Sequence, residues 1–117
     1  MHTDANCIFC KIVAKDIPAR IADENSRVLA FHDVNPMAPT HVLIVPKEHI
    51  ASVSDLSEDS ASVVADMTLM AKKLAIELQL AESGYRVLMN TGKNAGQSVF
   101  HLHMHLLGGR PMDWPPG

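Results

Sequence analysis

Hydrophobic residues recur with a helical period in the second half of the chain. Between positions 57 and 84 they are spaced four and three apart, which is typical of a helix with one buried face: Val63, Met67, Met70, Leu74 and Leu78. Ser57 is the expected N-cap, because Glu58 and Asp59 follow it where the helix dipole favours negative charge. Gly84 is the expected stop of this helix.

Strand patterns flank this helix on both sides. Residues 41–45 are β-branched and almost wholly apolar, which predicts a strand buried on both faces. A short helix is expected over residues 7–14, because apolar residues at its buried positions precede Pro18. Further strands are expected at residues 20–24, 27–32, 85–90 and 98–107. One long crossover helix among several strands indicates an α+β fold with a mainly antiparallel sheet, whose strand order these patterns leave open.

Length and composition indicate one globular domain over residues 1–117, in which residues 110–117 form a proline-containing C-terminal arm. The chain is 47% hydrophobic and 20% charged, and its net charge of −3 without a basic cluster argues against a nucleic-acid surface. No apolar run is long enough to span a bilayer, and the N-terminus has no apolar signal segment. We therefore expect a cytoplasmic protein without a membrane partner, in which a disulfide would not persist.

Three histidines at alternating positions, His101, His103 and His105, carry the most chemical information. Side chains of a strand alternate between faces, so these imidazoles are expected on one side, about 6.6 Å apart. The intervening Leu102, Met104 and Leu106 are expected to face the long helix. Imidazoles suit an anionic substrate or a metal ion, because they titrate near neutral pH and bind metals. The alternative is a surface strand that is merely rich in histidine and chelates metals by accident.

A glycine-containing loop over residues 91–97 precedes the histidines. Its backbone N–H groups, together with the Ser98 hydroxyl, are suited to holding phosphate oxygens. A glycine loop alone is a weak signal, but next to three aligned histidines it favours a phosphate site.

The alternation over residues 101–107 resembles the signature of the histidine-triad (HIT) superfamily, His-apolar-His-apolar-His-apolar-apolar. The resemblance extends over nearly the whole chain, through Ile8-Phe9, Phe31-His32-Asp33, Pro36, Ala38-Pro39-Thr40-His41, Pro46-Lys47, Asn90, Gly96-Gln97-Ser98 and Gly108-Gly109-Arg110. The closing Trp114-Pro115-Pro116-Gly117 is similar to the Hint branch, whose members are purine nucleoside phosphoramidases and homodimers. The resemblance implies a HIT-like fold with a mainly antiparallel five-stranded sheet, one long crossover helix and a short N-terminal helix.

The resemblance also implies a role for each matching residue. His103 falls on the nucleophile that attacks the α-phosphorus and carries a nucleotidyl intermediate. His105 and Ser98 fall on phosphate-contacting positions, where donors stabilise developing charge, and His41 is expected to aid proton transfer. The implied substrate-binding residues are Ile8, Phe9, Phe31 and Leu43 around the purine, Asp33 at the ribose hydroxyls, and Val34, Asn90, Gly96, Gln97 and Trp114 elsewhere around the site. Judged without the resemblance, Phe31 and Leu43 are equally suited to the core.

The pair Cys7-x-x-Cys10 departs from the best-known Hint proteins, which lack it. Some other HIT proteins carry such a pair with a histidine after the Pro-Lys segment and the first triad histidine, and these four residues bind structural zinc. This chain has both histidines, His49 and His101, so the resemblance implies a closed Cys2His2 zinc site. The alternative is two reduced cysteines packed as small hydrophobes. A catalytic zinc is disfavoured, because the family reaction needs no metal.

The interpretation favoured by these residues is a purine nucleoside phosphoramidase that works through a nucleotidyl-histidine intermediate. A first alternative is a dinucleoside polyphosphate hydrolase or nucleotidyltransferase of another HIT branch, which differs in the leaving group. A second is a non-catalytic nucleotide-binding regulatory module, whose mark would be a replaced middle histidine. His103 is intact, and the Trp114 tail favours the Hint branch.

Overall fold

The computed structural model describes residues 1–117, and its five strands form a single antiparallel sheet. Neighbouring strands pair in the order β1-β2-β3-β5-β4, which confirms the predicted α+β class and supplies the strand order. Neither α-helix is long and apolar enough to cross a membrane. The elements are α1 (Ile8–Val13), β1 (Ile21–Glu24), β2 (Val28–His32), β3 (Thr40–Pro46), η1 (Val53–Asp55), α2 (Ser62–Glu77), β4 (Tyr85–Leu88), η2 (Lys93–Ala95) and β5 (Met104–Gly108).

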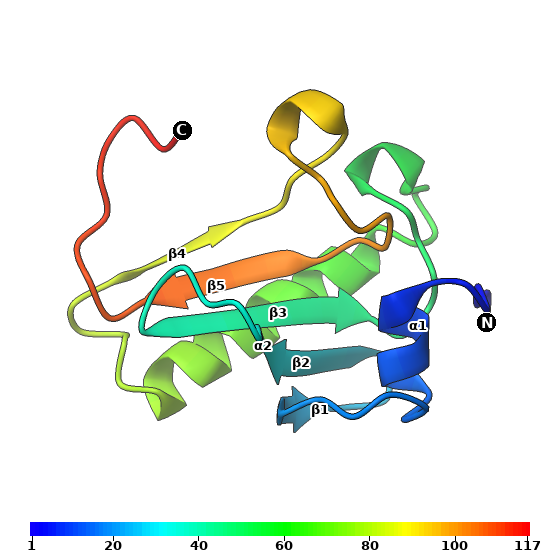
Figure 1. Cartoon of the computed structure of the whole chain (residues 1–117), viewed down its shortest axis with the longest axis horizontal. Coiled ribbons are helices and arrows are strands. Elements are labelled where there is room, and N and C mark those ends of the chain that lie inside the picture. The colour runs from blue at the N-terminus through cyan, green and yellow to red at the C-terminus, as the bar shows by residue number, and fades with distance from the viewer.

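The sheet is covered on both faces, and this explains the apolar run of β3. Helix α2 crosses the back of the sheet in Figure 1, whereas α1 stands at the front near one end. Val42 and Ile44 pack into the large core with α2, together with Leu102, Met104 and Leu106 as predicted. Leu43 and Val45, which point the other way, join a smaller core with α1. The front face, beside α1, is where the site lies.

Both ends of the long helix differ from the prediction. The Ser57 hydroxyl accepts the Ser60 N–H at 3.1 Å and so caps a separate turn before α2, whose own N-cap, Ala61, makes no side-chain bond. At the other end the helix stops before Gln79, whose φ is 62°, although Gly84 also has a positive φ, of 107°. The N–H of Leu80 then reaches the Ala75 carbonyl at 2.7 Å, a Schellman ending in which Leu80 is buried.

The last strand begins later than expected, at Met104 instead of residue 98. Its pairing with β3 runs only from Gly108 opposite Thr40 to Met104 opposite Ile44. Beyond that point the His101 side chain, not the backbone ladder, contacts the end of β3, since His101 Nε2 donates to the Pro46 carbonyl at 2.8 Å. Two of the three histidines therefore precede the strand, in a segment without regular secondary structure.

Candidate active site and metal cluster

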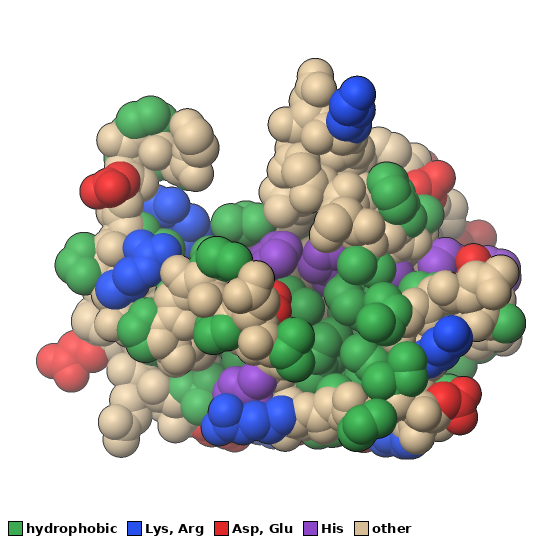
Figure 2. Space-filling model, in the orientation of Figure 1, with side chains coloured by type: hydrophobic (Ala, Val, Ile, Leu, Met, Phe, Trp, Pro, Cys, Tyr) green, Lys and Arg blue, Asp and Glu red, His purple; other side chains and the backbone are tan.

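A cavity of about 360 Å³ opens on the front face of the sheet, a size suited to a small-molecule ligand. Figure 2 shows histidine side chains beside hydrophobic ones on this face. The lining brings together many residues that the sequence singled out, from α1, β2 and the loop after it, β3, the segment before β5, and β5 itself: Ile8, Phe9, Phe31, Asp33, Val34, Leu43, Ser98, His103 and His105.

The apolar part of the cavity is built around Phe9. Its ring meets Phe31 edge to face at 5.4 Å and His103 at 5.1 Å, so α1 carries the aromatic group that joins β2 to the histidines. Phe31 and Leu43 are buried in the smaller core and also line the cavity. Val34 is 98% exposed at the mouth.

Sequence reasoning missed part of this lining. Ile12 lies one helical turn after Ile8 in α1, so the helical period was a usable signal for it. His32 stands inside the matched Phe31-His32-Asp33 segment but was given no role. No motif marked the remaining residues, which follow α1 or lie beside predicted ones: Ile17, Pro18, Ala19 and Val99.

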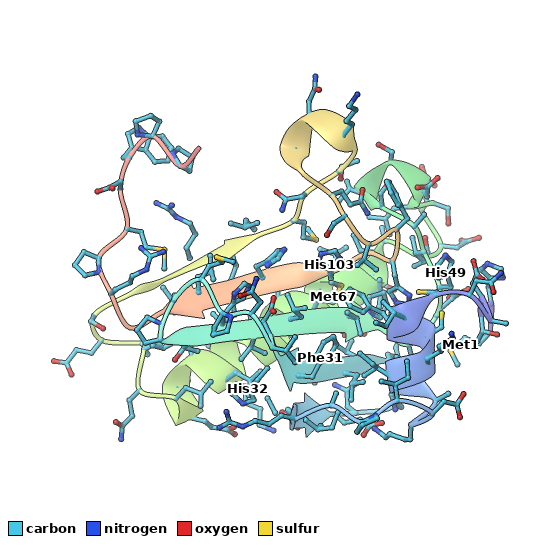
Figure 3. The ribbon with its side chains drawn as sticks, viewed as in Figure 1. Met1, Phe31, His32, His49, Met67 and His103 are labelled. Carbon is cyan, nitrogen blue, oxygen red and sulfur yellow. The ribbon has the colours of Figure 1, made fainter.

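His103 is held in one tautomer by the backbone. Its Nδ1 lies 2.7 Å from the carbonyl oxygen of His101, which can only accept, so the Nδ1 carries the proton. The other ring nitrogen, Nε2, then carries a lone pair in a residue that lines the cavity. The ring is 7% exposed and is labelled in Figure 3 just before β5. This is the preparation that a nitrogen nucleophile needs.

His105 is held in the opposite tautomer by His41. The Met37 N–H donates to Nδ1 of His41 at 3.0 Å, so His41 carries its proton on Nε2. That nitrogen lies 2.9 Å from Nδ1 of His105, which accepts from it. His105 therefore carries its own proton on Nε2, a buried atom with no hydrogen-bond partner within the chain. It is a free N–H donor at the cavity.

Burial keeps both members of this pair neutral near pH 7. Desolvation, together with the nearby His103 and His41, lowers the pKa of His105 to about 4. Desolvation also lowers the pKa of His41, against the opposing effect of Asp33, whose Oδ2 lies 3.5 Å from His41 Nε2. His41 is not among the lining residues, so it reaches the cavity only through His105.

The loop before the histidines is fixed from within. Gly92 and Gly96 have φ values of 81° and 83°, the left-handed region that favours glycine. Oε1 of the Gln97 amide accepts the Gly92 N–H at 2.9 Å, and its Nε2 donates to the carbonyls of Ala51 and Val99. Gln97 is thus occupied in shaping the loop, whereas Ser98 is the loop residue that lines the cavity.

The remaining predicted site residues lie outside this lining. Asn90 follows the end of β4, and Gly96 ends the η2 turn. Trp114 is in the C-terminal arm, which rises from the end of β5 in Figure 1, and it is 84% exposed within the single chain.

A second group of histidine and cysteine side chains lies at the N-terminal end of α1. Cys7, Cys10, His49 and His101 each offer one ligand atom, and these atoms all lie within 4.8 Å of one another. The His101 Nδ1 is 3.3 Å from the Cys7 sulfur and 3.6 Å from the Cys10 sulfur, and His49 Nδ1 is 3.4 Å from Cys10. Sulfur and nitrogen ligands of one tetrahedral zinc are about 3.6 Å apart. The four residues are close enough to bind a metal.

Comparison with known proteins identifies the family of this chain and several similar proteins. The family described as the HIT domain matches residues 14–112. A purine nucleoside phosphoramidase of Escherichia coli is 46% identical over 105 residues, which cover 90% of this chain and 88% of that protein.

Solved structures of similar proteins match the fold of this chain over nearly its whole length. A HIT family hydrolase from Legionella pneumophila is 50% identical with a TM-score of 0.93, covering 96% of this chain and 100% of that one. A HIT family hydrolase from Clostridium thermocellum is 51% identical with the same TM-score, covering 95% and 96%.

Proposed function

Because this chain belongs to the HIT domain family, we propose that it is a hydrolase that cleaves the P–N bond of purine nucleoside 5′-phosphoramidates. The observation that carries the proposal is a pair of imidazoles held in opposite tautomers around one cavity. His103 offers a lone pair there, and His105 offers an N–H. The first suits attack on phosphorus, and the second suits the charge that develops on a phosphoryl oxygen.

The reaction proceeds in two displacements. His103 Nε2 bonds to the α-phosphorus while the substrate P–N bond breaks and the departing amine takes up a proton that comes from solvent. Water then replaces His103 at phosphorus and returns a proton to solvent, which releases the nucleotide and restores the neutral ring. The ring is positively charged in between, and the His101 carbonyl that accepts from Nδ1 stabilises that charge. His41 aids proton transfer through His105, whose Nδ1 it contacts.

Other residues of the cavity suit the remaining parts of the substrate. Phe9, Phe31 and Leu43 provide an apolar slot for the purine. Asp33, whose Oδ2 lies 3.5 Å from His41 Nε2, lines the same cavity and accepts from the ribose hydroxyls. Ser98, which also lines the cavity, donates to the phosphate.

The test is a comparison of steady-state rates on an adenosine phosphoramidate and on a diadenosine polyphosphate. We expect kcat/KM to be at least tenfold higher for the phosphoramidate. A preference for the polyphosphate would assign the chain to the other enzymatic alternative. Nucleotide binding without turnover of either compound would instead indicate a regulatory module.

We further propose that the cluster at the end of α1 binds one structural zinc ion. The donor set fits, because two sulfurs and two imidazole Nδ1 atoms converge while the His101 Nε2 is already used on the Pro46 carbonyl. Burial raises the pKa of the Cys10 thiol, and a bound cation would reverse that effect by favouring the thiolate. Both cysteines are free in the structure, so each sulfur is available as a ligand.

We also propose that the protein is a homodimer. Large hydrophobic side chains are exposed on α2 and on β4, which is an edge strand of the sheet: Leu69, Ile76, Tyr85 and Val87. Such a surface on an edge strand suits pairing with a second copy. Sedimentation velocity tests this, and a monomer at micromolar concentration would contradict it.

A further inference from the structure

The C-terminal arm is tied at its base to the loop after β2. The Arg110 guanidinium donates to the Met37 carbonyl from Nη2 at 2.9 Å and from Nε at 3.3 Å. Beside it Gly109, with φ of 92°, lies so close to Pro39 that a Cβ there would be 2.9 Å from the Pro39 Cβ. The base of the arm and the loop after β2 are therefore joined by close packing as well as by hydrogen bonds.

Met37 connects this anchor to the site. Its carbonyl accepts from Arg110, and its N–H donates to Nδ1 of His41 at 3.0 Å. His41 is 6% exposed and donates in turn to His105. Four residues thus form a continuous line of hydrogen bonds from the arm to the His105 N–H at the cavity.

We propose that Arg110 is a positioning residue that sets the tautomer of His41 and so the direction of the His105 donor; this rests on the proposed function. Met37 is 60% exposed in a loop without regular structure, so the guanidinium limits how its backbone can turn. An Arg suits the task because its planar fork places two N–H groups on one carbonyl.

Loss of the Arg110 contact with Met37 would change which ring nitrogens of His41 and His105 carry protons. If the Met37 N–H turns away, His41 can carry its proton on Nδ1 and present a lone pair at Nε2. His105 must then donate from Nδ1, which leaves a lone pair on its Nε2 where the phosphoryl oxygen lies. A donor becomes an acceptor, and the developing negative charge is no longer stabilised. Asp33, 3.5 Å from His41 Nε2, opposes this change but accepts from the Asn35 N–H as well.

The test combines ring ¹⁵N NMR of the histidines with kinetics on an adenosine phosphoramidate, both on the full chain. For Arg110→Gln we expect His41 and His105 signals to move toward the other tautomer. We expect kcat to fall about threefold to tenfold, the worth of one hydrogen bond, with KM nearly unchanged. Arg110→Lys, which keeps one charged donor, should recover part of both effects.

Arg86→Gln is the matched control. Arg86 holds the same arm farther along, donating to the Asp113 carbonyl at 2.8 Å, but it makes no bond to Met37. The His41 and His105 ring signals of Arg86→Gln should match those of the wild type. Unmoved His41 and His105 signals in Arg110→Gln, or equal movement in Arg86→Gln, would overturn the proposal. A wild-type protein without phosphoramidase turnover would contradict the proposed function instead, while the ring signals would still decide the role of Arg110.

Discussion

Removing the proposed zinc ion should destabilise the whole domain, because its four ligands join three separate parts of the chain. Cys7 and Cys10 belong to α1 and its cap, His49 follows β3, and His101 precedes β5. The clearest perturbation is Cys10→Ser, since Cys10 contacts both histidines, His49 at 3.4 Å and His101 at 3.6 Å. A hydroxyl in its place is a poor zinc ligand.

The magnitude follows from linkage. A ligand at a thousandfold excess over its Kd stabilises the folded state by about 4 kcal/mol. For a chain of 117 residues, an unfolding entropy of about 2.1 cal/mol/K per residue converts this into roughly 15 °C of Tm. If Cys10 were only a small hydrophobe, the substitution would cost about 1–3 kcal/mol for burying a hydroxyl, with or without metal.

The assay is a set of thermal melts of the wild type and Cys10→Ser, each with zinc and after chelation, with metal content measured by native mass spectrometry. We expect one zinc per wild-type chain and a Tm that drops on chelation in the wild type but not in Cys10→Ser. His2→Gln is the matched control, because the His2 ring meets the His49 ring edge to face at 5.4 Å without belonging to the ligand set, and its Tm should drop on chelation as that of the wild type does. Metal-free wild type that melts as high as the loaded protein would refute the reasoning.

Three further predictions concern the active site and the arm. His103→Ala should keep nucleotide binding but lose most turnover, and His105→Ala should lose less, since water partly replaces a phosphate donor; equal losses would mean misassigned roles. Because burial lowers the His105 pKa to about 4 in the folded state, the unfolded chain binds the extra proton between pH 6.5 and 4. The unfolding free energy should therefore fall as pH drops through this window, by less than the roughly 3 kcal/mol of a fully buried ring, because solvent screens part of the effect at the partly exposed His105. Urea titrations should show a flatter dependence for His105→Asn. A chain ending at Gly109 should still dimerise yet change its kcat/KM ratios among amine leaving groups, because Trp114 would border the partner's site; unchanged ratios would leave the arm without this role.

The fold was largely predictable because its signals are local. The apolar run at residues 41–45 predicted a strand buried on both faces, and the structure covers those faces with α1 and α2. The strand order was not predictable, since it depends on how β5 inserts between β3 and β4 and on no local pattern. The late start of β5 has a similar cause, because the His101 side chain takes the carbonyl at the end of β3.

Helix ends were predicted less well, because several residues compete for each role. Ser57 has the right chemistry for an N-cap, but Ser60 lies at the right distance to use its hydroxyl in a turn. Gly84 is the obvious stop, yet Gln79 ends the helix earlier because Leu80 gains a buried position by doing so. Gly84 still has a positive φ, of 107°, but in a turn that follows the helix end.

The alternation of the histidines predicted that they share a face, but it could not predict that they differ in chemistry. Each ring acquires its tautomer from a different partner: His101 from the Pro46 carbonyl, His103 from the His101 carbonyl and His105 from His41. Two of these partners lie more than fifty residues away in sequence. His101 also joins the two sites, because its ring is a ligand in the cluster while its carbonyl fixes the His103 proton. A metal bound there would hold the carbonyl in place, so the cluster and the nucleophile depend on the same residue.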